Sequence, residues 1–177
     1  MSTIEGDILN VKIGVCKVTL DDTDLGHTKE GVSFSYEPDI ADVGVDQYGS
    51  TPIEKILTGE NLQIKLQLAE QTLANMKIAI PGGSHETGAQ GSRLEIGRNA
   101  GYGLSNEAYE LRLHPINNED ADLSEDVVIY KAVAVEAFEV GYKVDEQRVL
   151  EVTFQALIDE AKSVGNRLGH IGVDSIS

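Results

Sequence analysis

The chain has 177 residues, of which 30 are acidic and 14 basic, giving a formal net charge of −16, and 41% are apolar. This length is typical of one domain, and the apolar content argues against global disorder. The charge argues against stable binding to nucleic-acid phosphates. The acidic N-terminus and the lack of a long apolar run argue against a signal peptide and a membrane span, so we expect a single domain, residues 1–177, made in a cytoplasm.

Alternation of apolar and polar residues with a period of two predicts a mainly β fold. It is clearest at 61–69, where Leu62, Ile64, Leu66 and Leu68 fall on one side of an extended chain. The segment 127–140 is apolar on both sides and is predicted to be central. The other predicted strands are 13–18, which contains the single cysteine Cys16 as an expected core residue, then 32–37, 109–114 and 150–158.

One segment departs from this alternation. Ala69, Leu73, Met76 and Ile80 follow the spacing of an apolar stripe on a helix, so a helix is predicted over about 70–80 and is expected to end at Pro81. A β-sandwich or barrel-like subunit with one flanking α-helix is the simplest assembly of these elements. Residues 81–106 hold seven of the 18 glycines and are predicted to form a long loop, while 1–10 and 161–177 are predicted to be terminal arms.

Motifs for catalysis or metal binding are incomplete in this sequence. Asn118, Asp120 and Asp122 have the spacing of the first EF-hand ligands, but Leu123 stands where glycine is required and Ile129 where a glutamate is required. The glycines at 97, 101 and 103 fit neither phosphate-binding fingerprint. The four histidines are widely spaced, and the expectation is that they are exposed residues of loops or strand faces. We therefore predict a protein that is not an enzyme and has no metal site and no cofactor.

The segment 45–60, VDQYGSTPIEKILTGE, admits two interpretations. Thr51, Pro52 and Glu54 have the order of a capped helix start. Alternatively, residues 52–57 alternate like a strand, and the turn-like residues 58–61 would connect them as a hairpin to the strand at 61–69. The hairpin is favoured, with Gly49, Pro52 and Gly59 as its turn residues.

Residues 42–53, DVGVDQYGSTPI, together with 58–60 and the alternating strand that follows, resemble the tail tube proteins, or major tail proteins, of long-tailed bacteriophages. Residues 24–32 are similar to an early turn and strand of that family. The resemblance covers chiefly residues 14–80, and residues 81–126 contribute nothing to it. It rests on turns and strands rather than on a catalytic signature.

The resemblance implies a virion protein of the phage tail whose subunits form hexameric rings that stack into a tube. The implied partners are other copies of the chain, a tape-measure protein in the lumen, and the tail terminator and baseplate or distal tail proteins, with DNA passing through without stable binding and no membrane contact. In this setting Asp42 and Asp46, which would share one face of an extended segment, are candidates for an acidic channel wall. Candidates for contacts between subunits lie in the 81–106 loop and are Gly82, Gly83, Arg93 and Arg98.

The sequence is compatible with two other functions. A tube protein of a contractile injection or secretion system would have the same architecture but conduct protein. A small acidic β-sandwich that binds a ligand or acts as a hydrolase would place carboxylates such as Glu37, Asp39 and Asp42 at a cleft.

Overall fold

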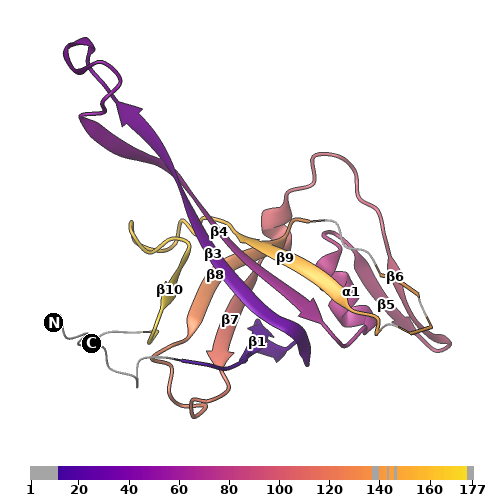
Figure 1. The fold of residues 1–177 in the computed structure, drawn as a ribbon. Coiled ribbons are helices and arrows are strands. Elements are labelled where there is room, and N and C mark those ends of the chain that lie inside the picture. Colours follow the sequence, from indigo (N-terminus) through magenta and orange to yellow (C-terminus); the bar gives the residue numbers. More distant parts are fainter. Residues whose placement is uncertain (1–11, 137–139, 143, 146, 175–177) are drawn as a thin grey trace.

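The fold is that of a computed structural model, which describes residues 12–136, 140–142, 144, 145 and 147–174. It is mainly β, as predicted, with one α-helix (Figure 1). The main sheet is antiparallel and has the strand order β2-β1-β7-β8-β9-β4-β3, with β10 also paired to β8. Its strands are β1 (Cys16–Leu20), β2 (Thr23–Asp24), β3 (Thr28–Val43), β4 (Glu54–Leu68), β7 (Tyr109–Pro115), β8 (Val127–Ala134), β9 (Leu150–Ala156) and β10 (Gly169–Ile171).

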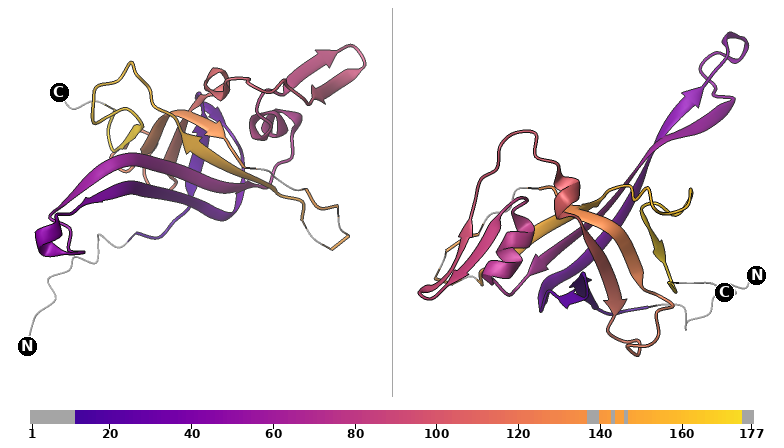
Figure 2. Two further views of the ribbon diagram at one scale, coloured as in Figure 1. Left: turned by 90° about the horizontal axis from the view of Figure 1, so that it is seen from above. Right: turned by 180° about the vertical axis from the view of Figure 1, so that it is seen from behind.

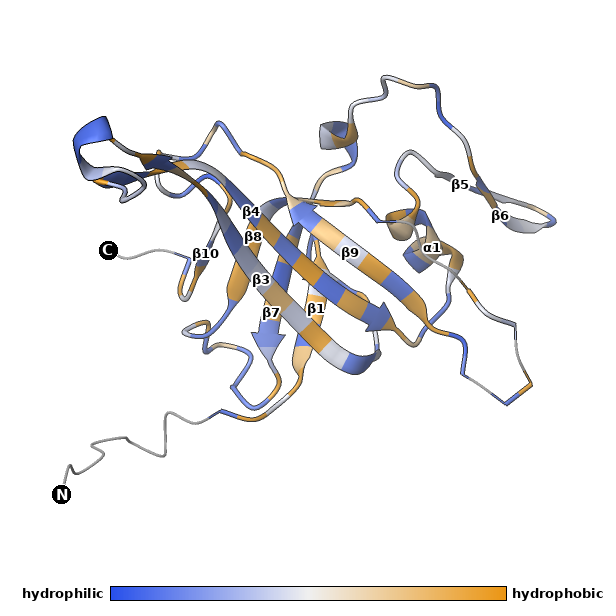
Figure 3. Cartoon of the chain, turned by 45° about the horizontal axis from the view of Figure 1, so that its top comes forward, coloured by the Kyte–Doolittle hydropathy of each residue, from blue (hydrophilic) through white to orange (hydrophobic). Residues whose placement is uncertain are grey.

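The sheet curls so that β1 and β7 face β4 and β9 across one hydrophobic core (Figure 2). Ile64, Leu66 and Leu68 of β4 are buried, whereas Lys65 between them is exposed, which confirms the predicted alternation. The bands of alternating hydropathy on β4 and β9 show the same pattern (Figure 3). Phe154 of β9 is the largest fully buried side chain, and Cys16 is only half-buried at the edge of the core.

The predicted helix is present as α1 (Leu73–Ala79), which is shorter than the segment 70–80 expected from the apolar stripe. It begins after Thr72, whose side chain accepts a hydrogen bond from the backbone N–H of Asn75, as an N-cap residue does. Met76 and Ile78 pack against the hydrophobic core, so the helix covers one end of the curled sheet.

Strand β8 is central, as predicted, although it ends at Ala134 and residues 137–139 lie outside the described part of the chain. One of its edges is shared by two strands in succession. Val127–Ile129 pair with β10, and Ala132–Ala134 pair with β9. The predicted C-terminal arm is therefore wrong for residues 169–171, which belong to the main sheet, and the predicted N-terminal arm, 1–10, lies outside the described residues.

The close approach of β10 to β8 requires glycine at position 169. A Cβ atom at Gly169 would lie 2.1 Å from the carbonyl oxygen of Val128, which is a backbone atom and cannot move aside alone. We expect Gly169→Ala to separate β10 from β8 and to raise the hydrogen-exchange rate of the Tyr130 amide, which donates to the Leu168 carbonyl. Gly88→Ala, at a glycine elsewhere in the chain with no atom near its Cβ position and no positive φ, is the control, and an equal effect of the two would contradict this reason.

The predicted loop 81–106 contains further regular structure. Strands β5 (Ser84–Gly88) and β6 (Gly91–Glu95) form a two-stranded hairpin beside α1, and a short 3-10 helix, η3 (Leu104–Glu107), follows. The expectation of one long irregular loop is therefore wrong. The sequence did not reveal these strands because they lack the alternation of apolar and polar residues that a core-facing strand shows.

Candidate functional site: the hairpin arm and the C-terminal strap

The most prominent surface feature is a long two-stranded ribbon formed by β3 and β4. Strand β4 pairs with β9 only from Gln63 to Leu68, so that towards its start it pairs with β3 alone. We call residues 36–62, which form this extension, the arm. The arm projects well beyond the curled sheet in all views (Figures 1 and 2). An isolated two-stranded hairpin is only marginally stable in water, which raises the question of what contacts this one.

The arm exposes an unusual set of side chains for a solvated ribbon. More than half of the surface of Ile40, Ile53, Ile56 and Leu57 is exposed, as is 66% of Tyr48. The arm also holds six carboxylates and one lysine, Lys55. Large apolar side chains exposed together are typical of surfaces that bind another molecule, so the arm is the first candidate functional site.

The predicted hairpin between residues 52–57 and the strand at 61–69 is wrong, because residues 54–57 and 61–68 belong to the single strand β4. Residues 45–60 are instead part of a hairpin formed by β3 and β4. The connection between the strands runs from Gly44 to Ile53 and includes a 3-10 helix, η2 (Asp46–Tyr48). Gly49, with a positive φ of 61°, and Pro52 both lie in this connection, as predicted for turn residues.

Gly59 lies instead within β4, where the predicted turn at 58–61 is absent. Asp39 pairs with Gly59, and the next residue, Ile40, pairs with Leu57, so that Thr58 is an extra residue in a β-bulge. The Thr58 hydroxyl donates a hydrogen bond to the carbonyl oxygen of Asp39, at 3.1 Å. A turn and a bulge favour similar residues, which is why the local sequence did not distinguish them.

The two acids predicted for a channel wall do not share a strand face. Strand β3 ends at Val43, so the alternation that would align Asp42 with Asp46 does not continue. Asp42 forms an ion pair with Lys55, directly opposite on β4. Asp46 begins η2 at the tip of the arm.

The residues predicted for contacts between subunits are separated by the structure. Gly82 and Gly83 are buried within the subunit, and Gly82 lies against the side chain of Arg98. They are therefore not part of the surface, contrary to the expectation. Arg93 is exposed and pairs with Glu95, while the guanidinium carbon of Arg98 lies 5.3 Å from the centre of the Tyr102 ring.

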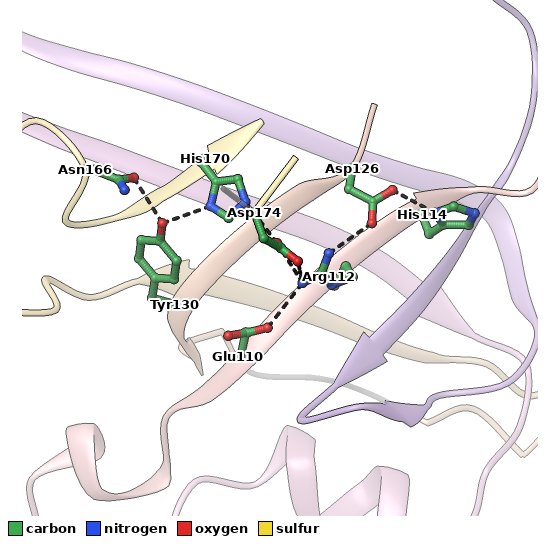
Figure 4. Close-up of polar contacts among 8 residues, drawn as sticks. All are labelled: Glu110, Arg112, His114, Asp126, Tyr130, Asn166, His170 and Asp174. Carbon is green, nitrogen blue, oxygen red and sulfur yellow. Dashed lines mark hydrogen bonds and ion pairs between the residues drawn. The ribbon is translucent and has the colours of Figure 1, made fainter. Parts of the chain in front are cut away.

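A second candidate surface is the C-terminal segment 157–174, which we call the strap. Its strand β10 pairs with the edge of β8, and polar side chains also join the strap to β7 and β8 (Figure 4). Arg112 of β7 donates to both carboxylate oxygens of Asp174, at 3.0 and 3.2 Å. The hydroxyl of Tyr130 on β8 donates to Asn166, at 3.1 Å, and lies 2.8 Å from the Nδ1 atom of His170. None of the strap residues belongs to the hydrophobic core cluster.

Asp126 is the buried centre of this polar network. Its side chain is fully buried and accepts hydrogen bonds from Arg112, at 3.2 Å, and from the Nδ1 atom of His114, at 2.7 Å (Figure 4). Its backbone carbonyl accepts a hydrogen bond from Gly172 of the strap. A buried carboxylate needs such partners because burial alone would strongly disfavour its charge.

The network also shifts pKa values. Partial burial acts to lower the pKa of Arg112, but the hydrogen bonds to Asp174 and Asp126 outweigh this effect and raise the pKa. For Asp174, desolvation acts to raise the pKa, but the hydrogen bond and charge of Arg112 lower it below its usual value. Both shifts mean that the contacts of Arg112 and Asp174 stabilise their charged forms, and the same contacts attach the strap.

We expect the strap to detach in acid. Because the pKa of Asp174 is lower in the folded protein, its stabilising contribution is present above the usual carboxyl pKa of 3.8 and is lost as the pH falls through the lowered value. Hydrogen exchange at the Tyr130 amide, which donates to Leu168, measures this detachment. Asp174→Asn should accelerate that exchange at neutral pH and reduce its dependence on acid. An unchanged acid dependence in the variant would assign the effect to another group.

Sequence reasoning missed this network because its members are far apart along the chain. His114 and His170 were expected to be exposed residues of loops or strand faces, but both are half-buried and hydrogen-bonded. The alternation on β7 was the available signal, since it places Arg112 and His114 on the side opposite Leu111 and Leu113.

The described residues also bear on three other features considered from the sequence, namely a cleft with carboxylates, a metal site and a membrane span. Strand alternation places Glu37 and Asp39 on one face of the arm and Asp42 on the other, so an exposed ribbon rather than a cleft carries these acids. In the described residues, no group of three or more His, Cys, Asp or Glu side chains is arranged to hold a metal ion. The described helices include none with the length and apolarity needed to cross a membrane.

Comparison with known proteins adds no assignment. No model of a known protein family matches the sequence, and no curated protein matches it either.

Proposed function

We propose that this chain is a structural subunit that assembles with copies of itself into stacked hexameric rings, as the tail tube proteins of long-tailed bacteriophages do. The observation that carries the proposal is the arm. It extends the sheet as a two-stranded ribbon with exposed apolar side chains, and such a ribbon gains stability when a partner covers it. The sequence resemblance over residues 14–80 includes this same hairpin.

The sheet has a further feature that favours self-assembly. Strand β3 is 16 residues long and is the last strand in the order of the main sheet. A long edge strand presents unpaired backbone groups to other chains, and a closed ring of subunits would pair or cover them. A neighbouring copy could therefore bind the exposed apolar side chains of the arm and the unpaired edge of β3.

The charge fits the passage of DNA through such a ring. A formal charge of −16 is repeated in every copy, and an acidic wall repels the phosphate backbone instead of retaining it. We therefore propose that the tube is part of a virion tail, with a tape-measure protein in its lumen before DNA passes.

Negative-stain electron microscopy and sedimentation velocity of the purified full-length chain test this proposal. The expected result is rings or tubes with a central hole, in amounts that increase with protein concentration. A protein that stays strictly monomeric at high concentration would contradict it. If the tubes conducted protein effectors instead of DNA, the assembly would stand and the virion role would fail.

A further inference from the structure

The self-assembly proposed above requires a surface on one copy that receives the arm of the next, and the inference that follows from it rests on that proposal. A cavity of about 410 Å³ lies between the base of the arm and the strap. Its lining is largely apolar and includes Tyr36 and Leu62 from the arm and Ile158, Val164 and Leu168 from the strap. Val164 is 85% exposed and Ile158 is 59% exposed, so the apolar lining is open to a ligand.

The polar groups of the groove indicate the charge of its ligand. Glu60 accepts a hydrogen bond from the Tyr36 hydroxyl, at 2.9 Å, and its carboxylate remains charged. Arg167 is exposed, and no ion pair joins its side chain to a carboxylate among the described residues. The groove therefore suits an apolar ligand that places a carboxylate beside Arg167 and away from Glu60.

The tip of the arm has this chemistry. Tyr48, Ile53 and Ile56 expose half or more of their surface there. Asp46 and Glu54 lie beside them, whereas the nearby Asp42 is already paired with Lys55. Asp46, Glu54 and Arg167 form no ion pair with another described residue, so the exposed apolar tip with its carboxylates is complementary to the apolar groove at its guanidinium.

A chain cannot bind its own tip in this way. The groove lies at the base of the arm, near Glu60, and the tip lies beyond Glu54 on the same extended strand. At the rise of a β-strand these positions are about 20 Å apart. A contact between tip and groove must therefore join two different copies. Because it uses different surfaces on each copy, it can extend into a ring or an open filament, or close as a reciprocal exchange of arms between two copies.

We propose that the arm tip of one copy, at Tyr48, Ile53 and Ile56, binds the groove between the arm base and the strap of the next copy, with Asp46 or Glu54 facing Arg167. Asp46 then serves a contact between subunits rather than the channel wall. The strap acts as one wall of the groove, so its polar attachment to β7 and β8 also holds the receptor surface in place.

Disulfide cross-linking tests the contact directly, because a disulfide requires two Cα atoms within about 7 Å. Ile53→Cys and Val164→Cys are made separately in a Cys16→Ala background, mixed under assembly conditions and oxidised. Random mixing of equal amounts places an Ile53→Cys tip against a Val164→Cys groove in only part of the contacts, so about half of the chains are expected in disulfide-linked dimer, and neither variant should form dimer alone. The matched control pairs Ile53→Cys with Ala89→Cys, an exposed position on the β5–β6 turn, and should give no dimer.

The outcomes separate this inference from the proposed function. Tubes seen by microscopy without the Ile53–Val164 disulfide would overturn the groove and leave the tube proposal standing. Equal cross-linking with Ala89→Cys, or dimer from Ile53→Cys alone, would also overturn the groove. Absence of any assembly of the unmodified chain would refute the proposed function itself.

Discussion

Replacing Asp126 by alanine is expected to lower the free energy of unfolding by about 1 to 3 kcal/mol, as measured by urea denaturation. The carboxylate is fully buried, and its loss leaves Arg112 and the Nδ1–H of His114 without their shared partner. Arg112 keeps its ion pairs with Asp174 and Glu110, but the largely buried imidazole of His114 loses the acceptor of its Nδ1–H, and a buried donor without an acceptor is destabilising. The strap should loosen in the same variant. The side-chain contacts that hold residue 126 in position are lost, and the backbone carbonyl of this residue accepts the hydrogen bond from Gly172.

Glu125→Ala is the matched control for this result. Glu125 is the preceding residue, but its carboxylate is partly exposed and pairs with Lys12 at the surface, at 3.0 Å. Exposed ion pairs contribute about 0 to 1 kcal/mol, so the control should change little. Similar losses for Glu125→Ala and Asp126→Ala would show that the buried network is not what stabilises this region.

Removing the distal arm is expected to abolish assembly while leaving the subunit folded. Residues 41–56 would be replaced by Asn-Gly, a two-residue hairpin connection between Ile40 and Leu57, which are paired partners in the structure. The deleted part contains no residue of the hydrophobic core, so the melting temperature should change by no more than a few degrees. Sedimentation velocity should then give a monomer at concentrations where the unmodified chain forms rings.

A substitution in the other projecting hairpin controls for a general effect of altered loops. Replacing Ala89 and Gln90 by Asn-Gly changes the turn between β5 and β6 without touching the arm. Assembly should be unaffected by this change. Tubes formed by the arm-deleted chain would contradict the role of the arm, and an unfolded arm-deleted chain would contradict the separation of arm and core.

Local patterns predicted the strands that face the core. Leu62 to Leu68 alternate because one side of β4 packs inward, and this requirement is visible in any short window. The helix was predicted for the same reason, although its first residues form a cap rather than a turn of helix. Fold class and the central position of β8 followed from these signals.

Pairing between distant segments was beyond such reasoning. The bulge at Thr58 depends on the register of β4 against β3, and a Thr-Gly sequence looks like a turn until that register is known. The network around Asp126 depends on β7, β8 and the strap meeting in space. The β5–β6 hairpin contributes little to the core, so its strands carry no apolar period to detect.

The pairing of β1 with β7 has a consequence for folding. Thr19 pairs with Arg112, so the sheet cannot close until most of the chain is available. Contacts between such distant residues form slowly, whereas the β3–β4 hairpin needs only neighbouring residues and can form early. A newly made chain would then present its apolar arm before the curled sheet is complete. We expect refolding yield to fall as concentration rises, because arms that meet partners too early would associate before the groove exists.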